Sequence, residues 1–277
     1  MPEGHTIHAL ARDLDAAFAG TAPMASSPQL RFADGAAQLD GHEVEAADAW
    51  GKHLFVDFAA DLRLHVHLGL IGKFTLTALD PEAQVPPVRG QVRLRLETAR
   101  HVADLRGPII CAVVTPEEVA AVIARQGPDP LRPGECDPER AWAKIHRSRR
   151  SIAELLMDQQ VLAGVGNVYR SEVLFRHRVG PMFEGHRIKR HTWQALWDDL
   201  VLLMPLGVVT GRIVTVERQV TTVLDQMARG VAPRPGRRRS SVYKRQGEPC
   251  PRCGSVVRSA VVAGRNLFWC ANCQRRT

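Results

Sequence analysis

The sequence predicts a multidomain α+β chain whose strands and helices fall in separate stretches. Alternating, β-branched runs fill residues 30–110, helical spacing dominates after about residue 113, and paired cysteines lie near the end. The 277 residues, 45% of them hydrophobic, suffice for two modest domains with buried cores. No apolar run is long enough to span a membrane, and residues 1–20 do not form a signal peptide. We therefore expect a cytoplasmic protein without a membrane partner.

The first part of the chain is expected to combine one helix with several strands. Apolar residues repeat at helical spacing over residues 3–19, which predicts an amphipathic opening helix. Four runs carry the alternating or β-branched residues that are typical of strands: 53–58, 62–68, 73–77 and 91–97. In the last run, basic side chains are expected on one face and aliphatic side chains on the other.

The middle of the chain is predicted to be helical. Thr115 and Pro116 provide a helix start, and residues 126–138 are rich in Gly and Pro, which favours a connector. Helical spacing then recurs in four segments: 139–147, 151–160, 167–177 and 190–206. Residues 208–246 lose this spacing and gain Arg, Ser, Pro and Gly, so we predict a long mobile loop there.

The cysteines near the end give a strong metal signal. Cys250, Cys253, Cys270 and Cys273 form a C-x2-C-x16-C-x2-C pattern, whose four thiolates match the tetrahedral preference of Zn²⁺. Because all four positions are filled, the pattern predicts one structural zinc ion, against the alternative of chance or redox pairs. The residues between the knuckles alternate and then turn, so we expect a β-hairpin with Arg265 near its tip.

A glycine turn between two predicted helices is a candidate phosphate site. Ser151 and Glu154 form a capping box, and Gly164-Val165-Gly166 leads into a second helix at which Asn167 is expected to be the cap. Backbone N–H groups at such a turn bind phosphate well. A simple helical hairpin remains the alternative for this segment taken alone.

The chain start offers a candidate nucleophile. Removal of Met1 would leave Pro2 with a free secondary amine, and such an amine can form an iminium with a sugar C1′. The dipole of the following helix disfavours a protonated amine there, and the carboxyl of Glu3 can exchange a proton. Taken alone, this short segment is also compatible with a start that has no function.

Lysine and arginine residues point to an anionic partner. The net charge is +8, and residues 234–277 hold eleven Lys or Arg and one acid, Glu248. A basic tail of this density suits nucleic acid. Lys52 follows Gly51 at a predicted turn before a strand, where a solvated surface lysine is the plainer alternative.

Taken in order, these elements resemble the Fpg/Nei family, the formamidopyrimidine-DNA glycosylase and endonuclease VIII group. The resemblance covers nearly the whole chain and is closer to the endonuclease VIII-like branch. It rests on these segments: Pro2-Glu3-Gly4, Gly51-Lys52-His53-Leu54, His67-Leu68-Gly69-Leu70, Gly127-Pro128-Asp129-Pro130-Leu131, Ala163–Tyr169 with Glu172, and the cysteine hairpin with Gly264-Arg265.

The resemblance implies a fold of three parts. These are an N-terminal β-sandwich catalytic domain with flanking helices over 1–113, a helix–two-turn–helix DNA-binding domain over 114–246 that includes the mobile loop, and a zinc-ribbon-like hairpin over 247–277. Damaged double-stranded DNA is the implied partner, bound in a basic cleft between the halves. We expect a monomer associated with the nucleoid.

The resemblance also implies a bifunctional glycosylase and abasic-site lyase of base excision repair. Pro2 would attack C1′ and displace the oxidised base, while Glu3 would protonate the ring oxygen, which requires a raised pKa of the kind that burial produces. Lys52 would donate a proton for β-elimination and Arg265 for δ-elimination, and both would contact phosphate. Asn167 would bind the DNA backbone.

The flipped base must leave a void that side chains fill. Leu70 matches a wedge position of the family, and Arg106 is the candidate for a second. The segment Asp104–Pro108 lacks the aromatic residue that the formamidopyrimidine branch carries there. His5-Thr6 replace the Pro-Glu that usually follows Pro-Glu-Gly or Pro-Glu-Leu in the family, so a second N-terminal carboxylate is missing.

These departures make oxidised pyrimidines the favoured lesions. Excision of 8-oxoguanine and formamidopyrimidine remains an alternative, as does a non-catalytic zinc-finger protein that binds or senses damaged DNA.

Overall fold

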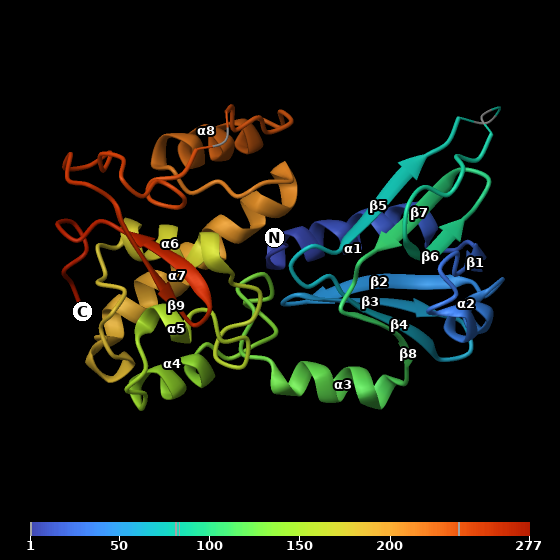
Figure 1. Ribbon diagram of the computed structural model, residues 1–277, viewed down its shortest axis with the longest axis horizontal. Coiled ribbons are helices and arrows are strands. Elements are labelled where there is room, and N and C mark those ends of the chain that lie inside the picture. The colour runs from blue at the N-terminus through green and yellow to red at the C-terminus, as the bar shows by residue number, and fades with distance from the viewer. Residues whose placement is uncertain (1, 81, 83, 238) are drawn as a thin grey trace. The chain divides into compact units, whose positions relative to one another are not determined.

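The computed structural model describes residues 2–80, 82, 84–237 and 239–277 (Figure 1). Met1, on whose removal the predicted nucleophile depends, and Arg238 of the basic tail lie outside the described residues. The chain divides into two compact units. The first runs up to Glu3 and from Ile7 to Arg125, and the second comprises Gly4–Thr6 and Gln126–Thr277.

The first unit is a sandwich of two antiparallel four-stranded sheets. One sheet has the order β1-β6-β7-β5 and the other β2-β3-β4-β8. The strands are β1 (Met24–Ser26), β2 (Val44–Trp50), β3 (His53–Phe58), β4 (Leu62–His67), β5 (Lys73–Ala78), β6 (Val92–Glu97), β7 (His101–Arg106) and β8 (Ile110–Val114). The four predicted strands are therefore confirmed, while β1, β2, β7 and β8 carried weaker alternation.

Helices complete the first unit and cover its core. They are α1 (Gly4–Phe18), α2 (Ala33–Leu39) and α3 (Pro116–Arg125). Leu14 and Phe18 of α1 join Leu64 of one sheet and Leu105 of the other in a common buried cluster. The core thus lies between the two sheets and under α1, which leaves the strand ends and turns to carry polar groups.

The second unit is built on helices. They are α4 (Glu139–His146), α5 (Ile152–Leu155), α6 (Asn167–Arg176), the short 3-10 turn η1 (Gly185–Arg187), α7 (Arg190–Thr210) and α8 (Glu217–Ala228). Residues 167–175 of α6 are all buried, and Trp193 and Leu200 of α7 belong to the same core. The two remaining strands, β9 (Arg258–Val262) and β10 (Arg265–Trp269), form the predicted hairpin.

The prediction of one long loop over 208–246 is wrong in its first half. α7 continues to Thr210, and α8 occupies Glu217–Ala228. The buried Val220 and Val223 anchor this helix to the core, and with Leu224 they follow helical spacing that the surrounding polar residues obscure.

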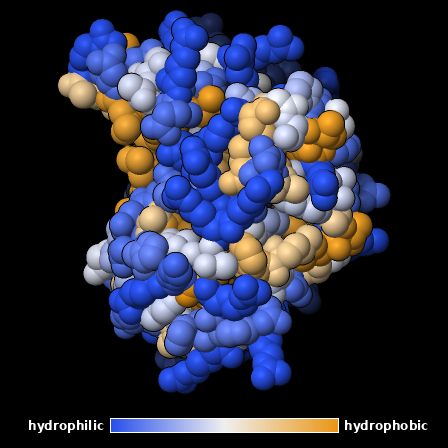
Figure 2. All heavy atoms as spheres, turned by 90° about the vertical axis from the view of Figure 1, so that its left-hand side faces the viewer, coloured by the Kyte–Doolittle hydropathy of each residue, from blue (hydrophilic) through white to orange (hydrophobic). Residues whose placement is uncertain are grey.

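Hydrophilic side chains cover most of the face that the second unit presents in Figure 2. Arg252, Arg258, Arg275 and Arg276 of the basic tail are exposed. In the part of the chain that the structure describes, no helix has the length and apolar character needed to cross a membrane.

Candidate active site

The predicted nucleophile and acid directly precede α1. Pro2 is half-buried, and Glu3, which occupies the N-cap position, is fully buried without capping the helix through its side chain. Neither residue is therefore used as an ordinary helix cap. The carboxyl of Glu3 is thus held inside the protein beside the candidate nucleophile.

The residue after Glu3 lies against the glycine turn of the second unit. The Gly4 N–H donates to the Gly164 carbonyl oxygen at 2.7 Å. A Cβ atom on Gly4 would lie 2.8 Å from Gly164 Cα, so only glycine permits this approach. The His5 ring meets the Tyr169 ring edge-on, with 5.5 Å between centroids. The start of α1 is thus fixed to the segment that the sequence marks as a phosphate site.

Side-chain and backbone contacts brace the glycine turn. The Gln159 amide donates to the carbonyl oxygens of Met157 and Val165, and its oxygen accepts from the Gly164 N–H. The Ala163 N–H donates to the Pro128 carbonyl oxygen at 3.0 Å. The connector around Pro128 therefore supports the turn, and the predicted helix over 151–160 is confined to α5 because turns replace it after residue 155.

Asn167 does not cap α6 as the sequence predicted. Gly166 takes the extended N-cap conformation with φ −124°, and Asn167 is the first helical residue. Its side-chain amide is thereby free of capping and donates to the Asn266 carbonyl oxygen at 2.9 Å, while its oxygen accepts from Arg170. Asn167 thus links the helix start to the hairpin residue next to Arg265.

The four cysteines are arranged for a zinc ion. The Sγ atoms of Cys250 and Cys273 are 3.9 Å apart, those of Cys253 and Cys270 are 3.5 Å apart, and all four lie within 4.8 Å of one another. A tetrahedral ion with zinc–sulfur bonds of about 2.3 Å separates the sulfurs by about 3.8 Å. The donor set therefore fits one structural zinc ion.

The hairpin places Arg265 at its tip, as predicted. Val262 pairs with Arg265 across a two-residue turn, in which Ala263 and Gly264 have φ of 49° and 70°. Two consecutive positive φ values match a type I′ turn, whose twist suits a hairpin. The guanidinium is thus carried on a short and geometrically defined element.

Lys52 lies in a two-residue turn between β2 and β3. Trp50 pairs with His53, and Gly51 takes φ +59° at the first turn position. His53 is directly opposite the end of β4, and its ring lies 4.9 Å from that of His67. The His53 Nδ1 atom lies 2.9 Å from His65 Nε2. A histidine cluster therefore adjoins the predicted catalytic lysine.

These histidines are neutral near pH 7. Burial, together with the neighbouring histidines and Lys52, lowers the pKa of His53 to about 3. Burial and His67 lower the pKa of His65 to about 4, and burial and Lys52 lower the pKa of His67. The surroundings of Lys52 thus contain no additional positive histidine at the pH of the cell.

The two predicted wedge residues differ in their surroundings. Leu70 is 47% exposed in the loop after β4. Arg106 instead donates to the Asp104 carboxylate at 2.8 Å and to the Arg89 carbonyl oxygen. Asp104 also binds Arg95 of β6, which is buried. Asp104 compensates the buried charge of Arg95.

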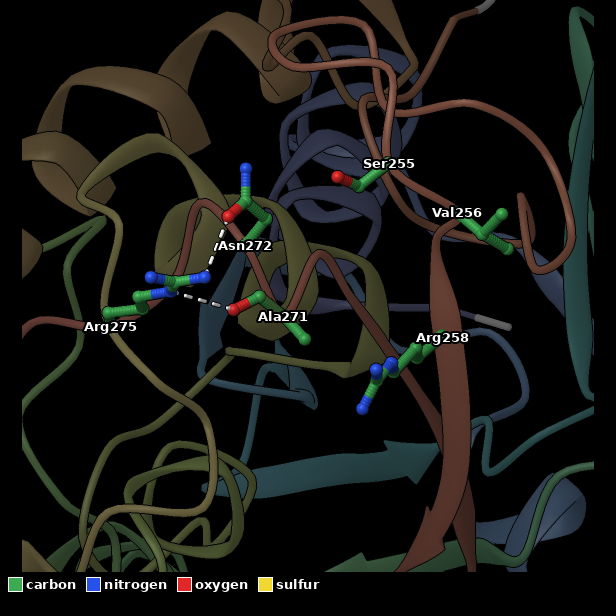
Figure 3. Close-up of a pocket in the computed structure, with 6 residues that line it drawn as sticks. All are labelled: Ser255, Val256, Arg258, Ala271, Asn272 and Arg275. Carbon is green, nitrogen blue, oxygen red and sulfur yellow. Dashed lines mark hydrogen bonds between the residues drawn. The ribbon is translucent and has the colours of Figure 1, made fainter.

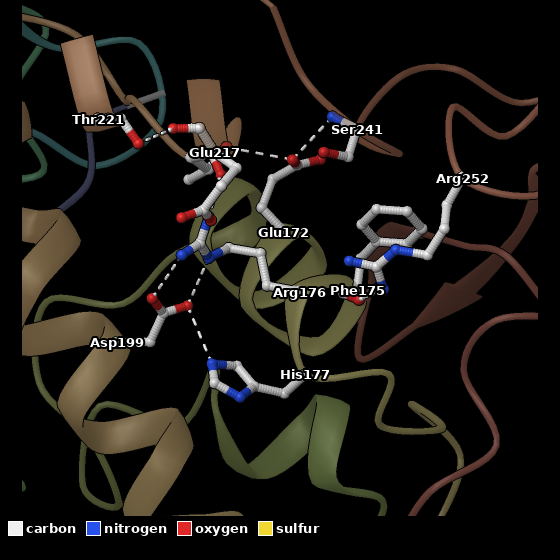
Figure 4. Close-up of polar contacts among 10 residues, drawn as sticks. Glu172, Phe175, Arg176, His177, Asp199, Glu217, Thr221, Ser241 and Arg252 are labelled. Carbon is white, nitrogen blue, oxygen red and sulfur yellow. Dashed lines mark hydrogen bonds and ion pairs between the residues drawn. The ribbon is translucent and has the colours of Figure 1, made fainter. Parts of the chain in front are cut away.

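Glu172 is a structural residue whose role the sequence did not specify. It is fully buried, and its carboxylate accepts from the Thr215 hydroxyl and from the N–H groups of Ser241, Val242 and Tyr243 (Figure 4). Together with Arg170 it is a charged residue among the apolar residues of α6, and that was the available signal. Glu172 fixes residues 241–243 to the helix that follows the glycine turn.

Two cavities lie beside these elements. One of about 340 Å³ is lined by residues of α6, by Ser241 and by Arg252, whose guanidinium stacks 4.9 Å from the Phe175 ring (Figure 4). Another of about 230 Å³ lies on the zinc hairpin and is bordered by Arg258 and Arg275 (Figure 3). Both are open and basic, which suits anions better than apolar ligands.

Three family models match the chain, one for each predicted part. They are the formamidopyrimidine-DNA glycosylase N-terminal domain over residues 1–108, the formamidopyrimidine-DNA glycosylase H2TH domain over 126–219, and the zinc finger found in FPG and IleRS over 247–276. The zinc-finger match agrees with the cysteine geometry, so the predicted structural zinc is confirmed.

Two relatives with similar sequences are endonucleases 8 by name. Endonuclease 8 1 of Mycobacterium tuberculosis is 48% identical over 274 residues, which is 99% of this chain and 100% of the relative. Endonuclease 8 of Escherichia coli K12 is 30% identical over 282 residues, with the same coverage of each chain.

Solved structures agree in fold. The Lactococcus lactis Fpg in complex with abasic-site DNA superimposes with a TM-score of 0.79 at 22% identity, covering 99% of this chain and 100% of that one. The same protein in complex with DNA containing an oxidised pyrimidine gives the same values. The predicted fold class is thus confirmed. By sequence, fold and zinc site, the chain belongs to the Fpg/Nei family of DNA glycosylases with abasic-site lyase activity.

Proposed function

We propose that this protein removes oxidised pyrimidines from double-stranded DNA and then cuts the strand by β,δ-elimination through a covalent link to Pro2. The observation that carries the proposal is that Pro2 directly precedes a fully buried carboxylic acid, Glu3, at the start of α1. The endonuclease 8 relatives support the lesion class. The expected site of action is the nucleoid in the cytoplasm, and the expected state is a monomer.

The first step joins enzyme and sugar. The lone pair of the Pro2 nitrogen forms a bond with C1′, and the damaged base leaves with the electrons of the glycosidic bond and takes up the Pro2 proton through solvent. Glu3 then gives its proton to the ring oxygen as the C1′–oxygen bond breaks. The product is an iminium between Pro2 and the opened sugar.

The later steps release the phosphates. Loss of a proton from C2′ of the iminium expels the 3′ phosphate, and Lys52 contacts this phosphate and donates a proton to it. Arg265 does the same for the 5′ phosphate in the δ-elimination. Asn167 and the glycine turn hold the neighbouring backbone, since N–H groups at a helix start favour phosphate. The zinc ion has a structural role only, because four thiolates leave no open position.

Borohydride reduction on DNA with an abasic site tests the covalent step. The wild-type protein is expected to yield a stable protein–DNA adduct, and Pro2→Gly is expected to yield clearly less of it; an adduct that survives this change undiminished would count against the proposal. Glu3→Gln should lose base excision but retain some cleavage of a preformed abasic site. A protein that only binds DNA would give no adduct and would be unaffected by an N-terminal tag, so these results separate the two functions.

Matched duplexes test the lesion class. We expect faster excision of thymine glycol than of 8-oxoguanine, because residues 104–108 offer no aromatic side chain beside the opposite base. Faster excision of 8-oxoguanine would assign the protein to the alternative specificity while leaving the lyase chemistry intact.

A further inference from the structure

A fully buried arginine lies in the first turn of α6, directly after the segment Ala163–Tyr169. This residue, Arg170, has no exposed surface. A guanidinium stays charged at every pH of the cell, and burying such a charge is costly unless its N–H groups are hydrogen-bonded. The acceptors that Arg170 reaches therefore indicate what this charge is used for.

The guanidinium of Arg170 donates to two acceptors on different elements. Its Nη2 atom donates to Asn167 Oδ1, and its Nη1 atom donates to the carbonyl oxygen of Ala153 in α5 at 3.3 Å. Hydrogen bonds from a charged donor are stronger than neutral ones, and in a buried site they are not weakened by water. Arg170 thus holds the side chain of Asn167 from the core of the second unit.

This contact determines which way the Asn167 amide faces. The oxygen of an amide side chain only accepts hydrogen bonds, and its nitrogen only donates them. Because Arg170 binds the oxygen, the nitrogen faces the other way and donates to the Asn266 carbonyl oxygen at 2.9 Å. The reverse orientation would turn the amide N–H groups toward the guanidinium and the amide oxygen toward the Asn266 carbonyl. Arg170 therefore selects the orientation that joins α6 to the hairpin.

The Asn266 carbonyl belongs to the hairpin that carries Arg265. Arg265 and Asn266 are the first two residues of β10, directly after the two-residue turn. Leu267, the next residue, is fully buried in the same core as Tyr169 of α6. The bond from Asn167 thus fixes the backbone one residue from Arg265, and the apolar contact fixes the residue after that. The place of the hairpin tip depends on both.

We propose that Arg170 is a positioning residue for δ-elimination, which acts through the Asn167 amide to hold Arg265 where the 5′ phosphate leaves. In that step C4′ of the opened sugar loses a proton, a C4′–C5′ double bond forms, and the C5′–oxygen bond breaks with its electrons going to the phosphate. This proposal rests on the proposed function and adds to it a residue that touches neither the DNA nor the reacting atoms. The earlier β-elimination uses Lys52 of the first unit, so it does not depend on Arg170.

The ratio of δ- to β-elimination products tests the proposal, measured on duplex DNA with a preformed abasic site and with the protein in excess. Arg170→Met keeps an unbranched side chain in the core but removes its N–H donors. We expect this ratio to fall about tenfold, the loss typical of one hydrogen bond to a charged group. The yield of borohydride adduct should stay within about twofold, because the bond to Pro2 forms before either elimination. Arg170→Lys, which can still donate to Asn167, should restore most of the δ product.

Asn167→Asp tests the same link even if Arg170→Met fails to fold. An aspartate keeps the oxygen that Arg170 binds but has no N–H for the Asn266 carbonyl. The product ratio should therefore fall as it does in Arg170→Met, although the pair with Arg170 becomes an ion pair. An unchanged ratio in Asn167→Asp would overturn the proposal.

Arg176→Met is the matched control. Arg176 lies on the same helix with its side chain only 15% exposed, but it pairs with Asp199 and Glu217. Its loss should destabilise the protein and leave the product ratio at the wild-type value. The proposal is wrong if Arg170→Met keeps the wild-type ratio, if Arg176→Met lowers it equally, or if the wild type stops after β-elimination. These results leave the bond to Pro2 intact, whereas absence of the wild-type borohydride adduct would overturn the proposed function itself.

Discussion

The sheet end around Lys52 and the helix start around Asn167 position candidate DNA contacts in different ways. In the second unit, buried polar groups and the cysteine cluster hold segments that are distant in sequence, as Glu172 does for residues 241–243. In the first unit, two-residue turns, glycine contacts and neutral histidines hold Lys52 and the β4–β5 loop that carries Leu70.

The two ways of holding side chains suit two different tasks, which are binding phosphate and entering the base stack. Binding a phosphate needs N–H groups and cations that stay in place, and charge-assisted hydrogen bonds provide that rigidity. Entering a base stack needs apolar side chains that remain uncovered, with few competing charges around them. Perturbing the second unit should therefore cost stability, whereas perturbing the first should change selectivity and pH dependence.

Removal of zinc is expected to have the largest effect. A structural zinc ion contributes on the order of 10 kcal/mol to the folding of a small zinc domain. Chelation should therefore unfold the hairpin that carries Arg265 and abolish DNA binding, while the unfolding midpoint of the first unit stays unchanged. Hydrogen exchange of β9 and β10, together with fluorescence anisotropy on DNA, measures both effects.

Cys136→Ser is a control variant, because Cys136 is a thiol outside the zinc cluster. Its loss should leave the zinc content and the protection of the hairpin unchanged. Retention of hairpin protection after complete zinc removal would contradict the assigned role of the metal.

Glu172→Ala should destabilise the second unit by about 3 kcal/mol, because it removes a buried carboxylate and leaves three N–H groups without their acceptor. Urea unfolding measures the loss. Glu217→Gln is the comparison, since Glu217 pairs with Arg176 but its side chain is 78% exposed. That change should cost less than about 1 kcal/mol. Equal losses of unfolding free energy in the two variants would show that the buried hydrogen bonds of Glu172 do not stabilise the second unit.

Acid should destabilise the first unit through its histidines. The pKa values of His53 and His65, about 3 and about 4, lie below the ordinary value of 6.5, so the unfolded chain binds more protons between these limits. The contribution of these neutral histidines to the free energy of unfolding is therefore fully present above pH 6.5 and is lost as the pH falls toward 4. Each of the two histidines is expected to account for a loss of up to about 2 kcal/mol between pH 7 and pH 5.

Urea unfolding at the two pH values tests this dependence, and His65→Gln should reduce it. An unchanged dependence in that variant would mean that the cluster is not responsible.

Gly69→Ala is expected to cost about 1 kcal/mol of stability, because one left-handed position and one contact with Ile109 are affected. Gly20→Ala, at a left-handed position with no neighbour near its Cβ, separates the backbone cost from the contact. Gly69→Ala should lower duplex excision more than Gly20→Ala does. Similar excision by both would argue against a defined position of the β4–β5 loop that carries Leu70.

The sequence predicted local features better than distant contacts. The cysteine spacing, the turn before Arg265 and the strand 53–58 depend on neighbouring residues, and the structure has all three. The α8 helix was missed because its apolar residues lie among Glu, Arg, Gln, Thr and Asp. The contact of Asn167 with Asn266 was missed because it joins segments far apart in the chain.

The central claim is the bond between Pro2 and the damaged sugar. Mass spectrometry of the borohydride-trapped adduct, after digestion of protein and DNA, tests it most directly. The account predicts that the sugar remnant is attached to the nitrogen of a peptide that begins at Pro2. An adduct on a lysine side chain, or an adduct on a protein that still carries Met1, would contradict it.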